Sequence, residues 1–244
     1  MDATRTAISL FGFIVNAFNS LQLARNFEDD FAQHQIKLDI MQLRFLRWGE
    51  IAKIATIDET QRDALDLVKT ALSNIQHSLR KAQEESQKVG KKTQKDAQTT
   101  ESLDPELCLA EDFKRIRNRL KAACQKHKVQ AYTVIESVKW VIYKKESFDQ
   151  LLENVSSLMD RLESIADVDH GKLRKLCDED CKGLSKLDLE KLDLAITGCD
   201  PLLESAISDT LRSEDGRTSV VMSHNTGHVT GIHNGDNRRL FLWR

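Results

Sequence analysis

Cysteine and histidine are the residues of this chain that could hold a metal ion. Cys177 and Cys181 are separated by one helical turn if this stretch is helical, and His170 lies upstream of them. A structural zinc site needs four such ligands at compatible spacing, and the neighbouring sequence does not offer two more. His34 lies in an apolar row, again without partners at a suitable spacing. The pattern predicts buried free thiols, a core histidine and no metal site.

Catalytic motifs are the next class of chemistry to consider. The sequence contains no P-loop, no GxGxxG, no HExxH and no nucleophile elbow. Its Asp and Glu residues are scattered over predicted helix surfaces, where charge normally serves solubility. We therefore expect that the chain is not an enzyme, and that it has neither catalytic residues nor a cofactor.

Composition narrows the class of protein. With 244 residues, 40% hydrophobic side chains, 10 Gly and only 2 Pro, the chain fits an all-α fold better than a many-turned β fold. Its 36 basic and 38 acidic residues nearly cancel, so no overall field would attract nucleic acid. Five Cys without a signal-peptide pattern favour a reducing compartment. We expect a cytoplasmic protein that does not bind nucleic acid.

Helical periodicity runs through residues 1–210 and predicts a multi-helix bundle. Asn26 is a candidate cap for a helix from Phe27, whose apolar row extends to Trp48 in steps of four and three. The polar stretch 86–104 is predicted to be a loop. Residues 129–143 are rich in β-branched side chains, but a lone strand would lack a partner, so a helix is predicted there as well.

The first 24 residues predict a hydrophobic N-terminal helix. No charge occurs between Arg5 and Arg25, so a helix over this stretch would be about 28 Å long, close to the ~30 Å of a bilayer core. Ser and Asn side chains dilute it, and its apolar residues form one broad face. Two interpretations remain open: a buried bundle helix, or one that can also enter a membrane. Its membrane-insertion candidates are Ile8, Leu10, Phe11, Phe13, Ile14, Val15, Phe18 and Leu21.

Residues 211–244 differ from the body and predict a non-helical tail. Residues 213–237 lack Leu and are rich in Ser, Thr, Gly, Asn and His, and Asn234-Gly235 is a tight-turn signal. Such a segment either stays disordered or stacks as a cross-β fibril with laddered Asn side chains. The candidate amyloid residues are Val220, Val221, Asn225, Val229, Ile232, Asn234 and Gly235.

Three blocks carry a family resemblance that spans about residues 5–210. Leu21 to Ile54, with its KLDI core and RWGE end, closely resembles the signature of the fungal HeLo domain, the prion-inhibition and propagation domain of HET-s-like proteins. Lys139 to Ile165 and Asp200 to Ala206 resemble the second block and the closing helix of that family. The resemblance implies a HeLo-type helical bundle.

The same resemblance implies a role in heterokaryon incompatibility and programmed cell death. In that family the N-terminal helix, here Ile8 to Leu23, leaves the bundle to form a membrane pore when a C-terminal amyloid templates the change. The resemblance also implies that the protein associates with itself and with a partner protein that has a HeLo domain or an amyloid motif. It further implies membrane lipid as a partner and relocation to the plasma membrane. Only Met1 to Thr6 precede the helix, a shorter lead than the family's, which predicts weaker insertion. The alternative is a non-toxic HeLo protein that regulates partners by oligomerising with them.

Overall fold

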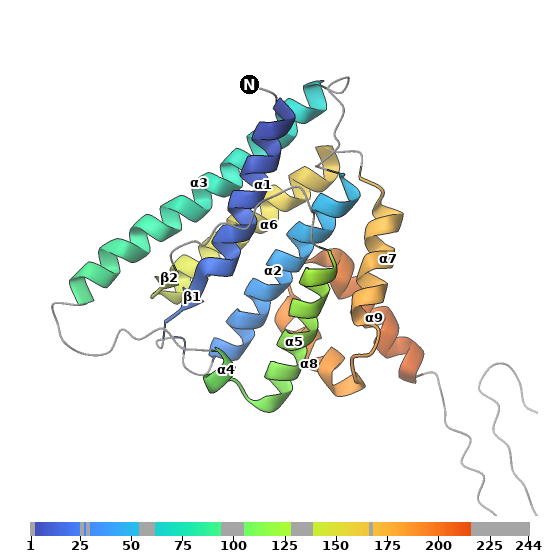
Figure 1. The fold of residues 1–244 in the computed structure, drawn as a ribbon. Helices are drawn as coiled ribbons and strands as arrows, with labels where there is room; N and C mark the ends of the chain where they lie inside the picture. The colour runs from blue at the N-terminus through green and yellow to red at the C-terminus, as the bar shows by residue number, and fades with distance from the viewer. Residues whose placement is uncertain are drawn as a thin grey trace, which may run out of the picture.

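The computed structural model describes residues 3–24, 27, 30–53, 62–93, 105–127, 139–165 and 168–215. These ranges form a helical bundle with one small sheet (Figure 1). The predicted multi-helix bundle is confirmed. In chain order the elements are α1 (Ala3–Ser20), β1 (Leu21–Leu23), α2 (Phe31–Ile51), α3 (Arg62–Thr93), α4 (Pro105–Cys108), α5 (Glu111–Lys126), β2 (Trp140–Ile142), α6 (Lys145–Ile165), α7 (His170–Cys181), α8 (Lys186–Ile196) and α9 (Pro201–Asp215).

Helix α2 is the centre of the bundle. It packs against α1, α5, α6, α7 and α8, and it buries residues on every side, including Ile40, Leu43 and Phe45. A helix that is apolar on more than one face must be surrounded, as the sequence indicated. Its start was predicted too early: Phe27 lies in a short 3-10 turn, α2 begins at Phe31, and Asn26 lies outside the described residues.

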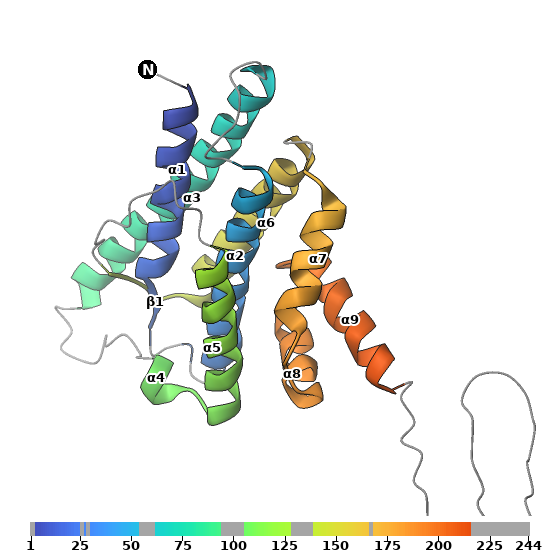
Figure 2. The ribbon, with the colours of Figure 1, turned by 45° about the vertical axis from the view of Figure 1, so that its right-hand side comes forward.

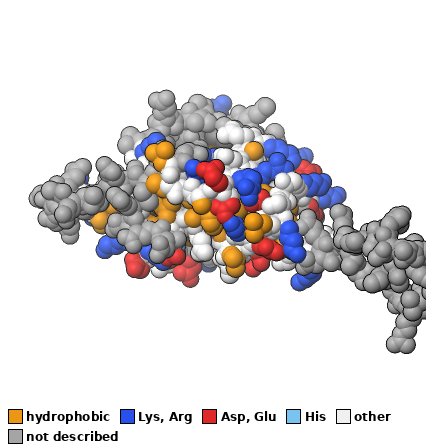
Figure 3. All heavy atoms as spheres, turned by 90° about the horizontal axis from the view of Figure 1, so that it is seen from below, with side chains coloured by type: hydrophobic (Ala, Val, Ile, Leu, Met, Phe, Trp, Pro, Cys, Tyr) orange, Lys and Arg blue, Asp and Glu red, His pale blue; other side chains and the backbone are white. Residues whose placement is uncertain are grey.

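Two groups of helices lie on opposite sides of α2, and α5 packs against α2 as well. Helices α1, α3 and α6 lie together on one side, while α7, α8 and α9 gather on the other (Figures 1 and 2). Asp200 precedes α9 and accepts a hydrogen bond on Oδ1 from Leu203 N at 3.1 Å, which is the helix cap that an Asp-Pro pair typically forms. On the face seen from below, both signs of charge are interspersed with hydrophobic side chains (Figure 3).

A two-stranded parallel sheet corrects two predictions. The N-terminal helix ends at Ser20 rather than at residue 24, and Leu21 lies in strand β1, where Leu21 pairs with Trp140 of β2. The predicted helix over 129–143 is therefore wrong for Trp140–Ile142, and residues 128–138 lie outside the described residues. Both strands have the same buried, half-buried, buried alternation. Residues 140–142 form a strand, as their side chains favour, because β1 supplies the partner strand that the sequence analysis did not find.

Helix α3 corrects the predicted loop. Residues 86–93 of the proposed 86–104 loop are the last two turns of α3, and residues 94–104 lie outside the described residues. The polar sequence stays helical because one face remains in contact with the bundle. Ser86 is buried, and Gly90 lies so close to Tyr143 that an added Cβ would stand 3.1 Å from its hydroxyl oxygen.

The boundary between bundle and tail also shifts. Helix α9 runs to Asp215, beyond the predicted boundary at residue 210. The rest of the predicted tail, with all seven candidate amyloid residues, lies outside the described residues.

The core packing predicts unequal costs for two phenylalanines. Phe45→Ala should lower the free energy of unfolding by about 3–5 kcal/mol, because its fully buried ring leaves a cavity at the centre of the bundle. Phe13→Ala is the control and should cost less than about 2 kcal/mol, because Phe13 is only partly buried. Urea unfolding measures both, and equal losses would contradict this account of the core.

Candidate functional site

Helix α1 is the element to which the sequence assigned a membrane role, and it lies packed in the bundle. Phe11, Ile14, Val15, Phe18 and Leu21 are buried, while the remaining three candidates, Ile8, Leu10 and Phe13, are half-buried. The broad apolar face expected from the sequence therefore faces α3 and α2. Within the described ranges, no helix combines the length and the apolar character that a membrane crossing requires.

An aromatic cluster joins α1 to α2. The ring of Phe11 stacks on that of Phe45, with centroids 4.6 Å apart and planes at 19°, and lies 6.3 Å from the ring of Trp48. Trp48 donates its Nε1 hydrogen to Leu162 O on α6 at 3.2 Å. The ring contacts between α1 and α2 consist largely of dispersion and apolar burial, which are small per atom pair but strong in sum.

The outer side of α1 is different in character. Ser9 and Asn19 are exposed, and Asn19 Oδ1 accepts a 2.7 Å hydrogen bond from Gln42 of α2. Phe13 lies beneath the guanidinium of Arg80 from α3, with 5.0 Å between Arg80 Cζ and the ring centroid. Helix α1 thus has a buried apolar face, and the contact of Asn19 with Gln42 on its outer side is accessible to solvent.

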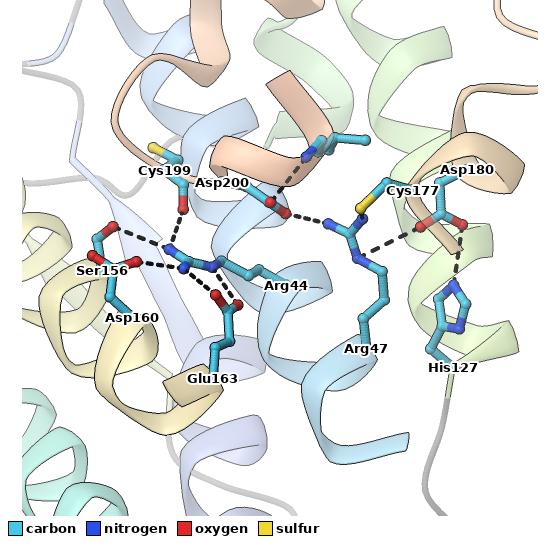
Figure 4. A network of polar contacts seen from close by, with 11 residues as sticks. Arg44, Arg47, His127, Ser156, Asp160, Glu163, Cys177, Asp180, Cys199 and Asp200 are labelled. Carbon is cyan, nitrogen blue, oxygen red and sulfur yellow. Dashed lines mark hydrogen bonds and ion pairs between the residues drawn. The ribbon is translucent and has the colours of Figure 1, made fainter. Parts of the chain in front are cut away.

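Helix α2 also carries a buried arginine, Arg44, that contacts polar groups from two segments. The side chain of Arg44 is only 3% exposed. It donates to both carboxylate oxygens of Glu163 at 2.9 and 2.8 Å and to Asp160 at 2.6 Å, all on α6. It also donates to Ser156 Oγ at 3.2 Å and to Cys199 O at 3.0 Å (Figure 4). These bonds offset the cost of removing the guanidinium from water.

One turn further along α2, Arg47 forms a second buried centre. Its terminal nitrogens contact Asp200 Oδ2 and Cys177 Sγ, and its Nε lies 3.7 Å from Asp180 Oδ2 (Figure 4). Arg47, Asp180 and Asp200 are each at most 4% exposed. Asp200 therefore both caps α9 and neutralises Arg47, so one carboxylate links the start of α9 to the central helix.

A buried histidine extends this centre toward α5. His127, 1% exposed, places Nδ1 2.6 Å from Glu50 Oε2 and Nε2 3.1 Å from Asp180 Oδ1. Two carboxylates around one ring favour the doubly protonated imidazolium, which donates to both. Burial alone would lower the pKa of His127, but the bonds to Asp180 and Glu50 outweigh it and raise the pKa above its ordinary value of 6.5.

The cysteines and the histidine considered as metal ligands lie in surroundings typical of core residues. All five cysteines, each within the described ranges, are free thiols, and Cys177 and Cys181 are buried. Burial raises the pKa of each of these two thiols to about 12, although Arg47 opposes the shift. His34 is 5% exposed and is hydrogen-bonded through Nδ1 to Asp30 O at 2.8 Å, as expected for a core histidine. Among the described residues, no group of His, Cys, Asp and Glu is arranged to hold a metal ion.

Sequence reasoning missed the paired arginine centres. Arg44 and Arg47 are three residues apart on a helix that is otherwise apolar on several faces, so burial of both was forced once α2 was placed at the centre. That signal was available in the sequence. Their partners on α6 and α7 were not predictable, because those carboxylates resemble the many surface carboxylates of the same helices.

Solved structures share this fold. The HET-s N-terminal domain superimposes with a TM-score of 0.76 at 22% identity, covering 86% of this chain and 99% of that domain. A doubly substituted variant of that domain gives a TM-score of 0.77, with 84% and 98% coverage. The bundle is therefore of the HET-s N-terminal type.

Sequence comparison identifies the family. The family described as HeLo, prion-inhibition and propagation, matches residues 3–194, and the chain belongs to that family. It is 24% identical over 226 residues to heterokaryon incompatibility protein S of Podospora anserina, and 26% identical over 220 residues to heterokaryon incompatibility protein s of the same fungus. Each match covers 86% of this chain and 73% of the relative. The chain is thus related to proteins of heterokaryon incompatibility.

The buried ion pairs predict a large penalty for Arg47→Met. Removing the guanidinium leaves Asp180 and Asp200 buried without compensation, which should cost about 3–5 kcal/mol in urea unfolding. Arg174→Met is the matched control, because Arg174 pairs with the exposed Asp178 and Asp209 and should lose about 1 kcal/mol or less. Combining Arg47→Met with Asp200→Asn should recover part of the loss. A double variant as unstable as the sum of the two single variants would contradict this pairing.

The raised pKa of His127 predicts a pH-dependent contribution to stability. The protonated ring stabilises the fold fully below the unfolded-state pKa near 6.5, and this stabilisation is lost as pH rises through the folded-state pKa. The difference in unfolding free energy between wild type and His127→Gln should therefore shrink as pH rises above 6.5. His77→Gln, at an exposed site on α3, is the control for replacing a histidine away from this buried centre. A His127 difference that grows with pH would refute the assignment.

Proposed function

We propose that this chain is a fungal cell-death effector of the heterokaryon-incompatibility type, in which α1 leaves the bundle and enters a membrane. The observation that carries the proposal is the position of α1. A stretch without charges from residue 6 to residue 24 lies against α2 and α3, mostly by apolar contacts. Membership of the HeLo family supports the same role. The proposal includes no enzymatic activity, no cofactor and no nucleic-acid partner.

The distribution of polar contacts supports a separable α1. The partners of Arg44 lie on α6 and at Cys199, and those of Arg47 lie on α7 and at Asp200. These charge-assisted bonds join α2 to the C-terminal half of the bundle without using α1. The remaining helices therefore keep their strongest directional contacts when α1 departs.

This switch requires a small free-energy difference between the state with α1 packed and the state with α1 released. A trigger shifts a two-state equilibrium only by its differential affinity for the two states, so the packed state must lie a few kcal/mol below the released one. Release of α1 removes the stacking of Phe11 on Phe45 and exposes one side of Trp48. Insertion into lipid returns an apolar environment to the α1 side chains, which offsets much of that loss.

The tail supplies the trigger in this proposal. Residues 216–244 combine β-branched residues with Asn and Gly, a composition suited to stacking in register. Templating by a matching amyloid motif of a partner protein gathers several HeLo domains. They self-associate, α1 is released, and the protein moves from the cytoplasm to lipid of the plasma membrane.

A second function is favoured by the depth of the aromatic cluster. Phe11 is 1% exposed and is stacked at the centre of the bundle, so α1 also contributes to the core. If the packing of α1 stabilises the bundle by more free energy than a trigger can supply, α1 stays packed. The protein would then be a non-toxic regulator that co-assembles with partner HeLo proteins.

The variant Ser9→Glu tests the proposed function. Ser9 is exposed, so the substitution should change the free energy of unfolding by no more than about 0.5 kcal/mol. A charge within an inserted helix costs about 2–3 kcal/mol, so dye release from liposomes, seeded with fibrils of a 213–244 peptide, should fall about tenfold or more. Ser73→Glu, an equally exposed site on α3, is the matched control and should release dye like wild type.

The outcomes separate the two functions. Dye release by Ser9→Glu equal to wild type would rule out insertion of α1. A seeded wild-type protein that releases no dye would favour the regulator. A 213–244 peptide that stays soluble under every seeding condition would contradict amyloid templating and leave the bundle alone as the functional unit.

A further inference from the structure

Helix α8 has an exposed apolar stripe. Among the described residues, four large apolar side chains are exposed, and two of them, Leu187 at 54% and Leu194 at 75%, lie on α8. Positions seven residues apart lie on the same side of a helix, so these two side chains form one stripe. The other two, Leu67 and Leu107, lie singly on α3 and α4. Of these surfaces, α8 is therefore the one that offers more than a single apolar contact.

An acidic edge lies beside this stripe. Glu190 follows Leu187 by three positions and precedes Leu194 by four, so its side chain neighbours both leucines on the helix surface. Asp193 follows Glu190 by three positions and continues the same edge. Glu190 is exposed and Asp193 is half-buried. Among the described residues, neither carboxylate has a cation within ion-pair distance.

The other charged side chains of α8 are already engaged. Asp188 binds Arg115 of α5, with 2.5 Å between Oδ1 and Nη2, and Lys191 binds Asp112 of α5. Lys186 takes part in a further interaction of its own. The two carboxylates of the acidic edge therefore remain available to a cationic partner from outside the described residues.

The last seven residues of the sequence have the complementary pattern. Residues 240–243, LFLW, are four consecutive apolar residues, and Arg238, Arg239 and Arg244 flank them. We propose that this segment, residues 238–244, binds the α8 stripe of its own chain. The apolar side chains cover the two exposed leucines, and the flanking guanidinium groups pair with the acidic edge. Apolar burial drives such a contact, and charge complementarity fixes its orientation.

The connecting chain is long enough for this contact. Helix α9 packs against α8 and ends at Asp215 (Figure 2). Residues 216–239 join that point to the LFLW run, and a coil of this length spans about 25 Å on average. Helix α8 itself is about 16 Å long. Tethering also raises the effective concentration of the segment at α8, so a weak contact is sufficient.

Docking of this segment would hold the tail against the bundle. The candidate amyloid residues, which lie within 220–235, are then placed between two attached points, Asp215 and Arg238. A ligand that needs the free state of the tail binds with an apparent affinity reduced by the population of that state, so the contact opposes templating. This consequence rests on the proposed function, but the contact itself does not.

The test measures how accessible Trp243 is in the full-length chain, without seeds or lipid. Trp48 and Trp140 are 0% and 6% exposed, so acrylamide quenching of tryptophan fluorescence reports mainly on Trp243. Subtracting the signal of the Trp243→Phe variant isolates this one indole. In the docked state the indole is covered by apolar side chains, and its quenching constant is low.

Two double variants test the apolar stripe. Leu187→Ser combined with Leu194→Ser should raise the quenching constant of Trp243 about threefold or more, because the indole loses its apolar contact. Leu67→Ser combined with Leu107→Ser removes two similarly exposed leucines elsewhere and should leave the constant unchanged. All four side chains are exposed, so the fold should tolerate these substitutions.

Charge reversal tests the acidic edge. Glu190→Lys should also raise the quenching constant of Trp243, because it repels the flanking arginines, whereas Glu84→Lys, at an exposed site on α3, should not. A wild-type Trp243 as accessible as in the Leu187/Leu194 double variant would overturn the proposal. Protection that is lost on dilution would overturn it as well, because it would place the segment on a second copy. Since no seeds or liposomes are present, either failure is separate from a failure of dye release.

Discussion

The burial of two arginines on the central helix is the constraint on which the rest of this bundle depends. A guanidinium inside a protein is tolerated only when carboxylates and other acceptors surround it. Arg44 and Arg47 therefore fix the positions of α6, α7 and Asp200 around α2 (Figure 4). Directional bonds of this kind have one good arrangement, so the C-terminal half of the bundle is held in a single register. The RWGE end of the family signature has a physical role here. Arg47 contacts Cys177 of α7 and Asp200 at the start of α9, Trp48 donates to Leu162 of α6, and Glu50 contacts His127 at the end of α5.

The attachment of α1 follows another principle. Its contacts with Phe45 and Trp48 are apolar, and the polar contact of Asn19 with Gln42 is exposed. Apolar burial is worth much in free energy but is available equally from lipid. The molecule thus combines helices that charge pairs join to α2 with a helix, α1, whose contacts with Phe45 and Trp48 are apolar. The function proposed above relies on this difference between the contacts of α1 and those of the two buried arginines.

The sequence predicted the features that depend on local pattern and missed those that depend on distant partners. The rows of α2 and the Asp200 cap were readable because periodicity and cap chemistry are local. Trp140–Ile142 was assigned to a helix because its partner, Leu21–Leu23, lies far away in the sequence and had been assigned to the end of a helix itself. The end of α3 was misread for the same reason, since Gly90 lies beside Tyr143, which is distant in the sequence. Within the candidate site, the apolar face of α1 was predictable, and the partners of Arg47 were not.

The pairing of β1 with β2 has a consequence for the order in which this protein is made. Leu21 emerges from the ribosome early, whereas Trp140, its partner, is synthesised only after α3 and α5 are complete. Until then the start of the chain lacks the strand that fixes its end, and α6, which receives the Trp48 hydrogen bond, is also missing. A nascent chain must therefore carry this apolar segment until β2 and α6 have been synthesised. For a chain of this topology, elongation pauses before β2 prolong the exposure of that segment, and pauses after α6 do not.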